Sequence, residues 1–261
     1  MIAPNGTATI TATGEYDREA VKLQTEEKIA QAEKEIAGNA ATETDSSEET
    51  GSQTSGFTDT QNHWAKDVIA EVKAAGTVKG VSDDEFAPDL GVTSGEYVAM
   101  LLRWFKNEIK GYSEGTFSGY MSNLERGWIN DAIAEVDSLQ ETYNEESYLK
   151  QIEFIKKRGW ITDELLSQGF AFDEKLTREK VAALTAIVYR SYMNEKEVYG
   201  SIEPYADSSD ISDWASDAVR ELKLRGVMVG DDNNMFNPKQ IVTRAEAAAI
   251  ISEMMKIEYK G

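Results

Sequence analysis

The spacing of a few landmark residues recurs in two distant parts of this chain, and this repetition constrains the fold more than any other feature. In each part a tryptophan is followed after 12 residues by a glycine, after a further 10 by a phenylalanine, and after a further 7 by a threonine. These residues are Trp64, Gly76, Phe86 and Thr93 in the first part, and Trp214, Gly226, Phe236 and Thr243 in the second. Three identical intervals indicate an internal repeat, and a short repeated unit must pack on its neighbours to bury a core.

A third copy with altered spacing lies between these two. Trp128 opens a segment with the tryptophan, aspartate and aliphatic spacing of the first helix, and Phe170 precedes Thr177 by the same 7 residues. Trp128 lies 31 residues before Gly159 instead of 12, so 19 extra residues are present. We expect these residues, around 137–150, to extend or interrupt the first helix of this copy.

Each repeat is predicted to be a helix, a loop and a second helix. In the first helix apolar residues recur at three- and four-residue steps, as in Trp64, Val68 or Ile69, and Val72, and a glycine then ends the helix. The second helix begins at a threonine that precedes an apolar run, and in two copies a Phe-x-Pro loop joins the helices. The sequence therefore predicts a mostly α-helical fold in which three helix–loop–helix repeats pack around one shared core.

Composition divides the chain into further segments. Residues 39–56 are rich in Ser, Thr, Gly and acidic residues and contain no basic residue, which is typical of a flexible linker. Before them lies an N-terminal segment, residues 1–38, with a possible β-strand at its start and a solvated helix after it. The repeats themselves are expected at residues 57–110, 120–195 and 202–258.

The charge and the missing residue types exclude several functions. The chain has 27 Lys and Arg against 47 Asp and Glu, and a net charge of -20 disfavours nucleic-acid binding. With no Cys and one His, thiolate sites and multi-histidine metal centres are excluded. No segment is apolar enough for a membrane span, and the first residues lack the regions of a signal peptide. The chain is therefore expected to be a cytoplasmic protein or a piece of an exported one.

The Trp, Gly, Phe-x-Pro and Thr-Arg-Ala-Glu landmarks of residues 57–256 together resemble the S-layer homology family. The resemblance implies three modules with pseudo-threefold symmetry and no catalysis or cofactor. It implies anchoring of bacterial surface proteins, with secondary cell wall polysaccharide, often pyruvylated, bound in grooves between modules. It also implies a location outside the cell, in the wall or S-layer, with S-layer lattice partners through the parent protein. Residues 6–13 resemble the last strand of a bacterial group 2 Ig-like domain, as in a fragment of a longer surface protein.

The Thr-Arg-Ala-Glu element predicts a helix cap and leaves one charge unexplained. Thr243 and Glu246 have the spacing of a capping box, in which each side chain satisfies a backbone N–H of the first turn. Arg244 has no such role, and with free helical N–H groups it could bind an anion. We therefore predict Arg244 as the first ligand-binding residue and Arg178, in the middle copy, as the second. A solvated surface arginine is the alternative, and on either account Arg244→Ala is expected to leave stability nearly unchanged.

The other copies depart from this element. In the first copy Thr93 and Glu96 keep the cap, but Ser94 stands where the arginine is expected. The groove that uses this position is predicted to bind weakly or not at all. In the middle copy Lys180 replaces the glutamate, which weakens the capping box.

Several loop residues are weaker candidates for ligand binding. They are Asp59, Asp207, Lys79, Gly80 and Gly230, which recur at matching places in the copies. Loop hydrogen bonds and turn geometry are the alternative explanations for them. The repeated tryptophans, Trp64, Trp128 and Trp214, are predicted to be core residues and not platforms for sugar rings, because they begin the apolar periodicity of their helices.

Two other functional classes remain open. The same repeats could belong to a self-assembly or scaffolding protein that binds protein partners, and the many carboxylates could include the pair of a glycan hydrolase. A calcium loop at Asp231 is rejected, because Phe236 and Val242 stand where an EF-hand needs Gly and Glu. We favour a non-catalytic anchor that binds an anionic wall glycan.

Overall fold

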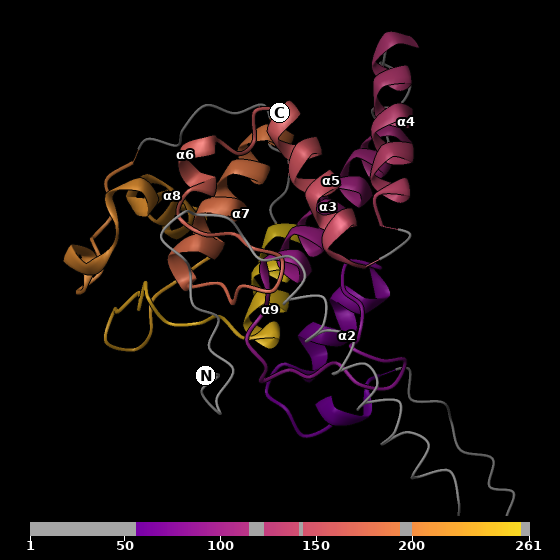
Figure 1. The fold of residues 1–261 in the computed structure, drawn as a ribbon. Helices are drawn as coiled ribbons and strands as arrows, with labels where there is room; N and C mark the ends of the chain where they lie inside the picture. The colour runs from indigo at the N-terminus through magenta and orange to yellow at the C-terminus, as the bar shows by residue number, and fades with distance from the viewer. Residues whose placement is uncertain (1–55, 115–122, 141–142, 194–199, 257–261) are drawn as a thin grey trace, which may run out of the picture. The chain divides into compact units, whose positions relative to one another are not determined.

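The computed structural model describes residues 56–114, 123–140, 143–193 and 200–256 (Figure 1). The chain divides into two compact units, 1–53 and 54–261, and all described residues belong to the second. The predicted N-terminal segment, and the predicted linker up to residue 55, lie outside the described residues.

The described residues are mostly helical, as predicted, and they contain no β-strand longer than an isolated bridge. The helices are η1 (Thr58–Thr60), α2 (Lys66–Ala74), α3 (Ser94–Glu114), α4 (Asn123–Ser138), α5 (Glu145–Lys157), α6 (Asp163–Leu166), α7 (Arg178–Met193), η3 (Ser208–Asp210), α8 (Asp213–Leu224) and α9 (Arg244–Met255).

Three glycines end a helix in the same way. Gly76, Gly159 and Gly226 have φ angles of 70°, 71° and 74°, in the left-handed region that glycine adopts without a steric cost. In each case the next residue donates its N–H to a carbonyl five residues earlier, as in the bond from Thr77 to Val72. This is a Schellman motif, and it fixes where the first helix of each repeat ends.

The three segments that lead into α3, α7 and α9 form a closed ring of backbone hydrogen bonds. Val92 N–H donates to the Val242 carbonyl (2.8 Å), Val242 N–H to the Leu176 carbonyl (3.0 Å), and Leu176 N–H to the Val92 carbonyl (3.0 Å). Each copy therefore donates to one neighbour and accepts from the other. This cyclic order is the pseudo-threefold arrangement that the resemblance implied.

A second set of bonds occupies the N-terminal N–H groups of the same helices. The first two N–H groups of each helix donate to loop carbonyls of the neighbouring copy: Ser94 and Gly95 to Glu174 and Phe172, Arg178 and Glu179 to Gln240 and Pro238, and Arg244 and Ala245 to Leu90 and Pro88. These N–H groups are therefore not free for an anion, and that premise of the sequence analysis is wrong. Their hydrogen bonds join neighbouring copies instead.

The packing of the outer helices follows the same cyclic order. Helix α2 packs on α9, α8 on α7, and α5 on α3. The first helix of the middle copy is therefore α5, and Ile152 and Ile155 precede Gly159 by the same steps as Ile69 and Val72 precede Gly76. The assignment of this role to the segment from Trp128 is wrong, because α4 is an added helix that packs on α3. The extra residues lie before the first helix, not inside it.

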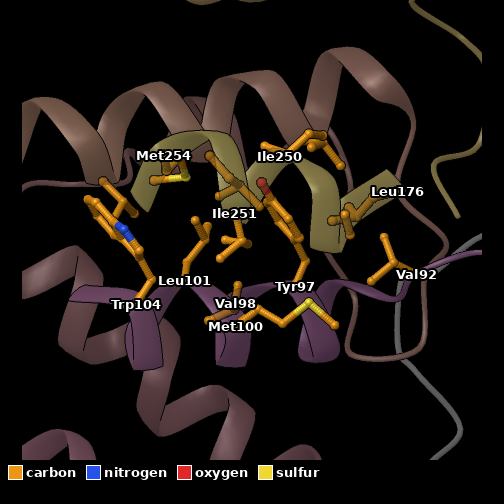
Figure 2. Close-up of a cluster of buried hydrophobic side chains, with 14 of the residues drawn as sticks. Val92, Tyr97, Val98, Met100, Leu101, Trp104, Leu176, Ile250, Ile251 and Met254 are labelled. Carbon is orange, nitrogen blue, oxygen red and sulfur yellow. The ribbon is translucent and has the colours of Figure 1, made fainter. Parts of the chain in front are cut away.

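The core lies between the second helices of the repeats. Figure 2 shows side chains of α3 and α9 interdigitating, with Leu176 and Val92 at one end. Tyr97 and Trp104 of α3 are among the largest fully buried side chains. Trp214 packs partly buried against this core, as predicted, but Trp64 is 66% exposed, so its prediction as a core residue is wrong.

We expect residues 57–256 to unfold in one cooperative transition, because each copy depends on both neighbours for its backbone hydrogen bonds. Differential scanning calorimetry should give equal calorimetric and van't Hoff enthalpies. Separate transitions for the three repeats would contradict a closed ring.

Candidate functional site

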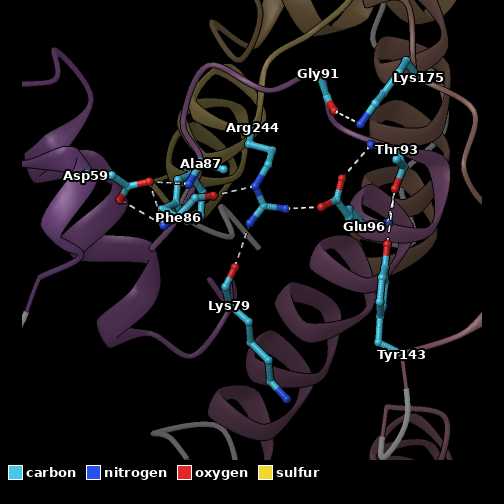
Figure 3. A network of polar contacts seen from close by, with 10 residues as sticks. All are labelled: Asp59, Lys79, Phe86, Ala87, Gly91, Thr93, Glu96, Tyr143, Lys175 and Arg244. Atoms are coloured by element: carbon cyan, nitrogen blue, oxygen red, sulfur yellow. Dashed lines mark hydrogen bonds and ion pairs between the residues drawn. The ribbon is translucent and has the colours of Figure 1, made fainter. Parts of the chain in front are cut away.

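Arg244 lies at the first position of α9, and its guanidinium is buried against the first copy. Nε donates to the Phe86 carbonyl (2.7 Å), Nη2 donates to the Lys79 carbonyl (2.9 Å), and Nη1 forms an ion pair with Glu96. Figure 3 shows this side chain pointing away from its own helix toward these three partners. Arg244 is only 3% exposed. The expectation that the fold leaves its charge unused is wrong.

Glu96 links Arg244 to the cap of α3. Its second carboxylate oxygen accepts from the Thr93 N–H (2.8 Å), and its own N–H donates to the Thr93 hydroxyl (3.2 Å). The capping box of the first copy is therefore confirmed, as is that of Thr243 and Glu246. One carboxylate thus serves a helix cap and an ion pair between two copies.

Arg178 occupies the matching position on α7 with fewer partners. Its Nη2 donates to the Val229 carbonyl (3.0 Å), which corresponds to the bond from Arg244 to Lys79, and its guanidinium lies 5.3 Å from the Phe236 ring centre. Among the residues described, no carboxylate forms an ion pair with it. Arg178 is partly exposed, so it is more accessible to a ligand than Arg244.

The joint between the first and middle copies is closed without an arginine. Ser94 is fully buried, and a Cβ atom at Gly95 would lie 2.5 Å from the Phe172 ring. The Phe170 carbonyl, which corresponds to the Phe86 carbonyl bound by Arg244, accepts here from the hydroxyl of the buried Tyr148 of α5. A neutral hydroxyl therefore replaces one bond of the arginine in this joint.

Asp59 and Asp207 hold the Phe-x-Pro loops. The Asp59 carboxylate accepts from the N–H groups of Phe86 and Ala87, and Asp207 accepts in the same way from the two matching residues of the third copy. Ala87 and Asn237 both have φ near 57°, in the left-handed region. These two aspartates therefore stabilise a loop conformation that is costly for a residue with a Cβ atom.

Gly80 and Gly230 are required by packing within their own loops. A Cβ atom at Gly80 would lie 2.6 Å from the Phe57 ring, and one at Gly230 would lie 3.1 Å from the Tyr205 ring. The loop that Gly80 shapes leaves the neighbouring Lys79 side chain exposed.

Two accessible cations, Lys79 and Arg103, lie near the buried pair of Arg244 and Glu96 beside α3, in a region that we call the α3 surface. It comprises Lys79, Glu96, Arg103, Tyr143 and Arg244. Arg103 follows Glu96 by seven residues, or two helical turns, and so lies on the same face of α3. Figure 3 shows Lys79 and Tyr143 on either side of Glu96. These residues come from all three copies.

Arg103 is the functional candidate that the sequence analysis missed. Burial lowers its pKa to about 10, and the charge of Arg244 acts in the same direction, whereas Tyr143 opposes the shift. The guanidinium remains charged at neutral pH, yet no hydrogen bond or ion pair joins it to another described residue. The sequence feature that could have identified Arg103 is that it is the single cation within the otherwise apolar stretch Val98–Phe105 of α3.

The other two copies do not repeat this charge pattern. Three residues after the turn glycine, Lys79 corresponds to Val229 and Thr162; ten residues after the cap threonine, Arg103 corresponds to Glu253 and Ile187. The face of α9 thus carries an acid where α3 carries a cation. Asp231 lies close enough to Arg178 for the arginine's charge to help lower the pKa of its carboxyl group. Of the three surfaces, the α3 surface is the cationic one.

Comparison with known families identifies these repeats. The model of the S-layer homology domain matches residues 56–98 and 204–248. The chain carries S-layer homology domains. Such domains are non-catalytic anchors of surface proteins, and the matches support a role in anchoring at the cell wall and a location there or outside the cell. Among the described helices, none has both the length and the apolar composition for crossing a bilayer.

Similar proteins share the region as a small part of their length. An amylopullulanase from Thermoanaerobacterium thermosulfurigenes is 30% identical over 77% of this chain and 9% of its own length. Exoglucanase XynX from Acetivibrio thermocellus is 29% identical over 77% of this chain and 16% of its own length. A surface-layer 125 kDa protein from Lysinibacillus sphaericus is 42% identical over 21% of this chain and 5% of its own length. The chain thus spans less than a fifth of each relative.

We expect Arg244→Ala to destabilise the domain by about 3 kcal/mol, because it leaves Glu96 without its partner in a mostly buried ion pair. Arg178→Ala is the matched control, and it should cost less than about 1 kcal/mol because this side chain is partly exposed and has fewer partners. Urea denaturation monitored by circular dichroism measures both values. Equal losses would contradict the structural role of Arg244.

We expect Ala87→Asn to raise stability by up to about 1 kcal/mol, because asparagine tolerates the left-handed conformation better than alanine. The reverse change in the third copy, Asn237→Ala, should lower it by a similar amount. Thermal melts of the two variants should therefore shift in opposite directions, and a shift of the same sign in both would contradict this explanation of the loop.

Proposed function

We propose that this region holds its parent protein at the bacterial cell wall by binding an anionic secondary cell wall polysaccharide, and that the α3 surface is its main contact. The observation that carries the proposal is the presence of two accessible cations, Lys79 and Arg103, that form no ion pair with another described residue on a protein whose net charge is -20. They flank the buried ion pair of Arg244 and Glu96. The surrounding acidity gives no long-range attraction to an anionic polymer. Binding therefore depends on cations placed at the point of contact.

Arg103 is suited to meet an acidic group of the glycan. It is partly buried and has lost part of its hydration, as its lowered pKa of about 10 indicates. A carboxylate or phosphate placed against it would supply the missing hydrogen-bond acceptors, and arginine can offer two parallel donors. The exposed ammonium of Lys79 adds a second positive charge from the loop.

The candidates from sequence take different roles in this proposal. Arg244 fixes Glu96 and the Lys79 loop, so it acts on binding mainly through the shape of the surface. Arg178 marks a second and weaker contact on the surface along α9. The acidic residues Asp231 and Glu253 of that surface repel an anionic glycan. Asp59, Asp207, Gly80 and Gly230 shape the loops that carry the contacts.

We further propose that the middle copy is a third module of the same family, with α4 added before it. Its turn glycine, its backbone bonds to both neighbours and the packing of α5 on α3 follow the same order as in the two matched modules. We propose module limits of 57–110, 120–195 and 202–258.

Isothermal titration of the full chain with purified wall polysaccharide tests the main proposal. We expect the double variant Lys79→Ala/Arg103→Ala to bind at least about tenfold more weakly, since a hydrogen bond to a charged group contributes about 1.5–3 kcal/mol. Lys66→Ala/Lys157→Ala is the control, because it removes the same charge from exposed helical positions elsewhere. If both pairs weaken binding equally, net charge and not the α3 surface is responsible.

Sedimentation with cell walls tests the class of ligand. The chain should sediment with intact walls and stay in solution with walls stripped of their non-peptidoglycan polysaccharide. Equal binding to stripped walls would overturn the polysaccharide assignment and favour peptidoglycan or a protein partner.

A further inference from the structure

Tyr143 is a large aromatic side chain that is exposed and yet held in place. It is 54% exposed. Its hydroxyl lies 3.3 Å from the Thr93 hydroxyl, and its ring centre lies 5.1 Å from that of Phe172 at an interplanar angle of 48°. Contacts at the hydroxyl and at the ring therefore fix its orientation while half of its surface faces solvent.

The position of Tyr143 places it beside the cations of the α3 surface. Burial raises the pKa of its hydroxyl, and the charges of Glu96, Arg244 and Arg103 all act on that group. The hydroxyl therefore stays protonated at neutral pH. The side chains of Tyr143 and Arg103 lie near enough for each to affect the pKa of the other.

Tyr143 comes from the segment that is particular to the middle copy. It lies between the added helix α4 and helix α5, directly before Asn144, which caps α5 through its side chain. Among the described residues of the other two copies no helix matches α4, so no described segment there corresponds to the α4–α5 connection. The added segment thus supplies an aromatic side chain to a surface formed mainly by the first and third copies.

We propose that Tyr143 is a specificity-determining residue of the α3 surface, against whose exposed ring face the apolar face of a sugar ring packs while an acidic substituent of the glycan meets Arg103. This inference rests on the proposed function and adds the residue that recognises the sugar itself. Binding sites for small ligands combine aromatic side chains with a few placed polar groups, which is the composition found here. A tyrosine already held at both ends loses little conformational entropy on binding.

Titrations of three variants of the full chain with purified wall polysaccharide test this role. Tyr143→Ala should weaken binding about tenfold, Tyr143→Leu should weaken it nearly as much because it lacks the flat ring, and Tyr143→Phe should stay within about threefold of the parent. Leu149→Ala is the control, since Leu149 is 59% exposed on the neighbouring helix α5. Thermal melts show whether each variant is folded, and Tyr143→Leu keeps the test valid if Tyr143→Ala is not.

A chemically altered polymer separates the sugar contact from the charge contact. Polysaccharide whose acidic substituents have been removed should bind more weakly and lose its dependence on Arg103, but Tyr143→Ala should still weaken what remains. If the parent chain fails to bind the native polymer, the proposed function is wrong. If the parent binds it and Tyr143→Ala binds equally well, the proposed function stands and the role of Tyr143 is overturned.

Discussion

The closed ring of backbone hydrogen bonds among Val92, Leu176 and Val242 is the constraint on which the rest of this structure depends. Each bond joins residues far apart in sequence, so no copy can form it alone. Once the ring is closed, the first two N–H groups of α3, α7 and α9 reach loop carbonyls of the neighbouring copy. The capping boxes at Thr93 and Thr243 then serve the next N–H group of α3 and α9. The helix ends that an isolated repeat would expose to solvent thus become the joints between copies.

Arg178 and Arg244 stand at the same position of their repeats but differ in burial and in partners. Arg244 meets a glutamate on the next copy and becomes a buried structural residue, whereas Arg178 meets only a backbone carbonyl and the Phe236 ring, and stays accessible. Burying a charge is costly unless it is paired and hydrogen-bonded, and only Arg244 has the full set of partners. The third joint has no arginine and avoids the cost, because the neutral Tyr148 hydroxyl donates to the matching carbonyl, that of Phe170.

The sequence predicted what depends on local spacing and missed what depends on distant partners. The turn glycines, the capping boxes at Thr93 and Thr243 and the mostly helical fold follow from intervals within one repeat, and all are found. The burial of Arg244 could not be predicted, because its partners lie about 150 residues earlier in the chain. The first helix of the middle copy was misassigned because α4 shares the apolar spacing of any amphipathic helix, whereas the position of Gly159 marks the correct one.

Because of the cyclic order, a substitution at the arginine position of one repeat alters the surface of a neighbouring repeat. The arginine position of each copy faces the neighbouring copy, so the surface along α3 receives Arg244 of the third copy and not the residue at position 94. Ser94 instead faces the loop of the middle copy, through its N–H bond to the Glu174 carbonyl. The missing arginine of the first copy therefore removes a cation from the surface along α7. The α3 surface keeps Arg244 and gains Lys79 and Arg103, so it is the cationic surface although the motif of the first copy lacks an arginine.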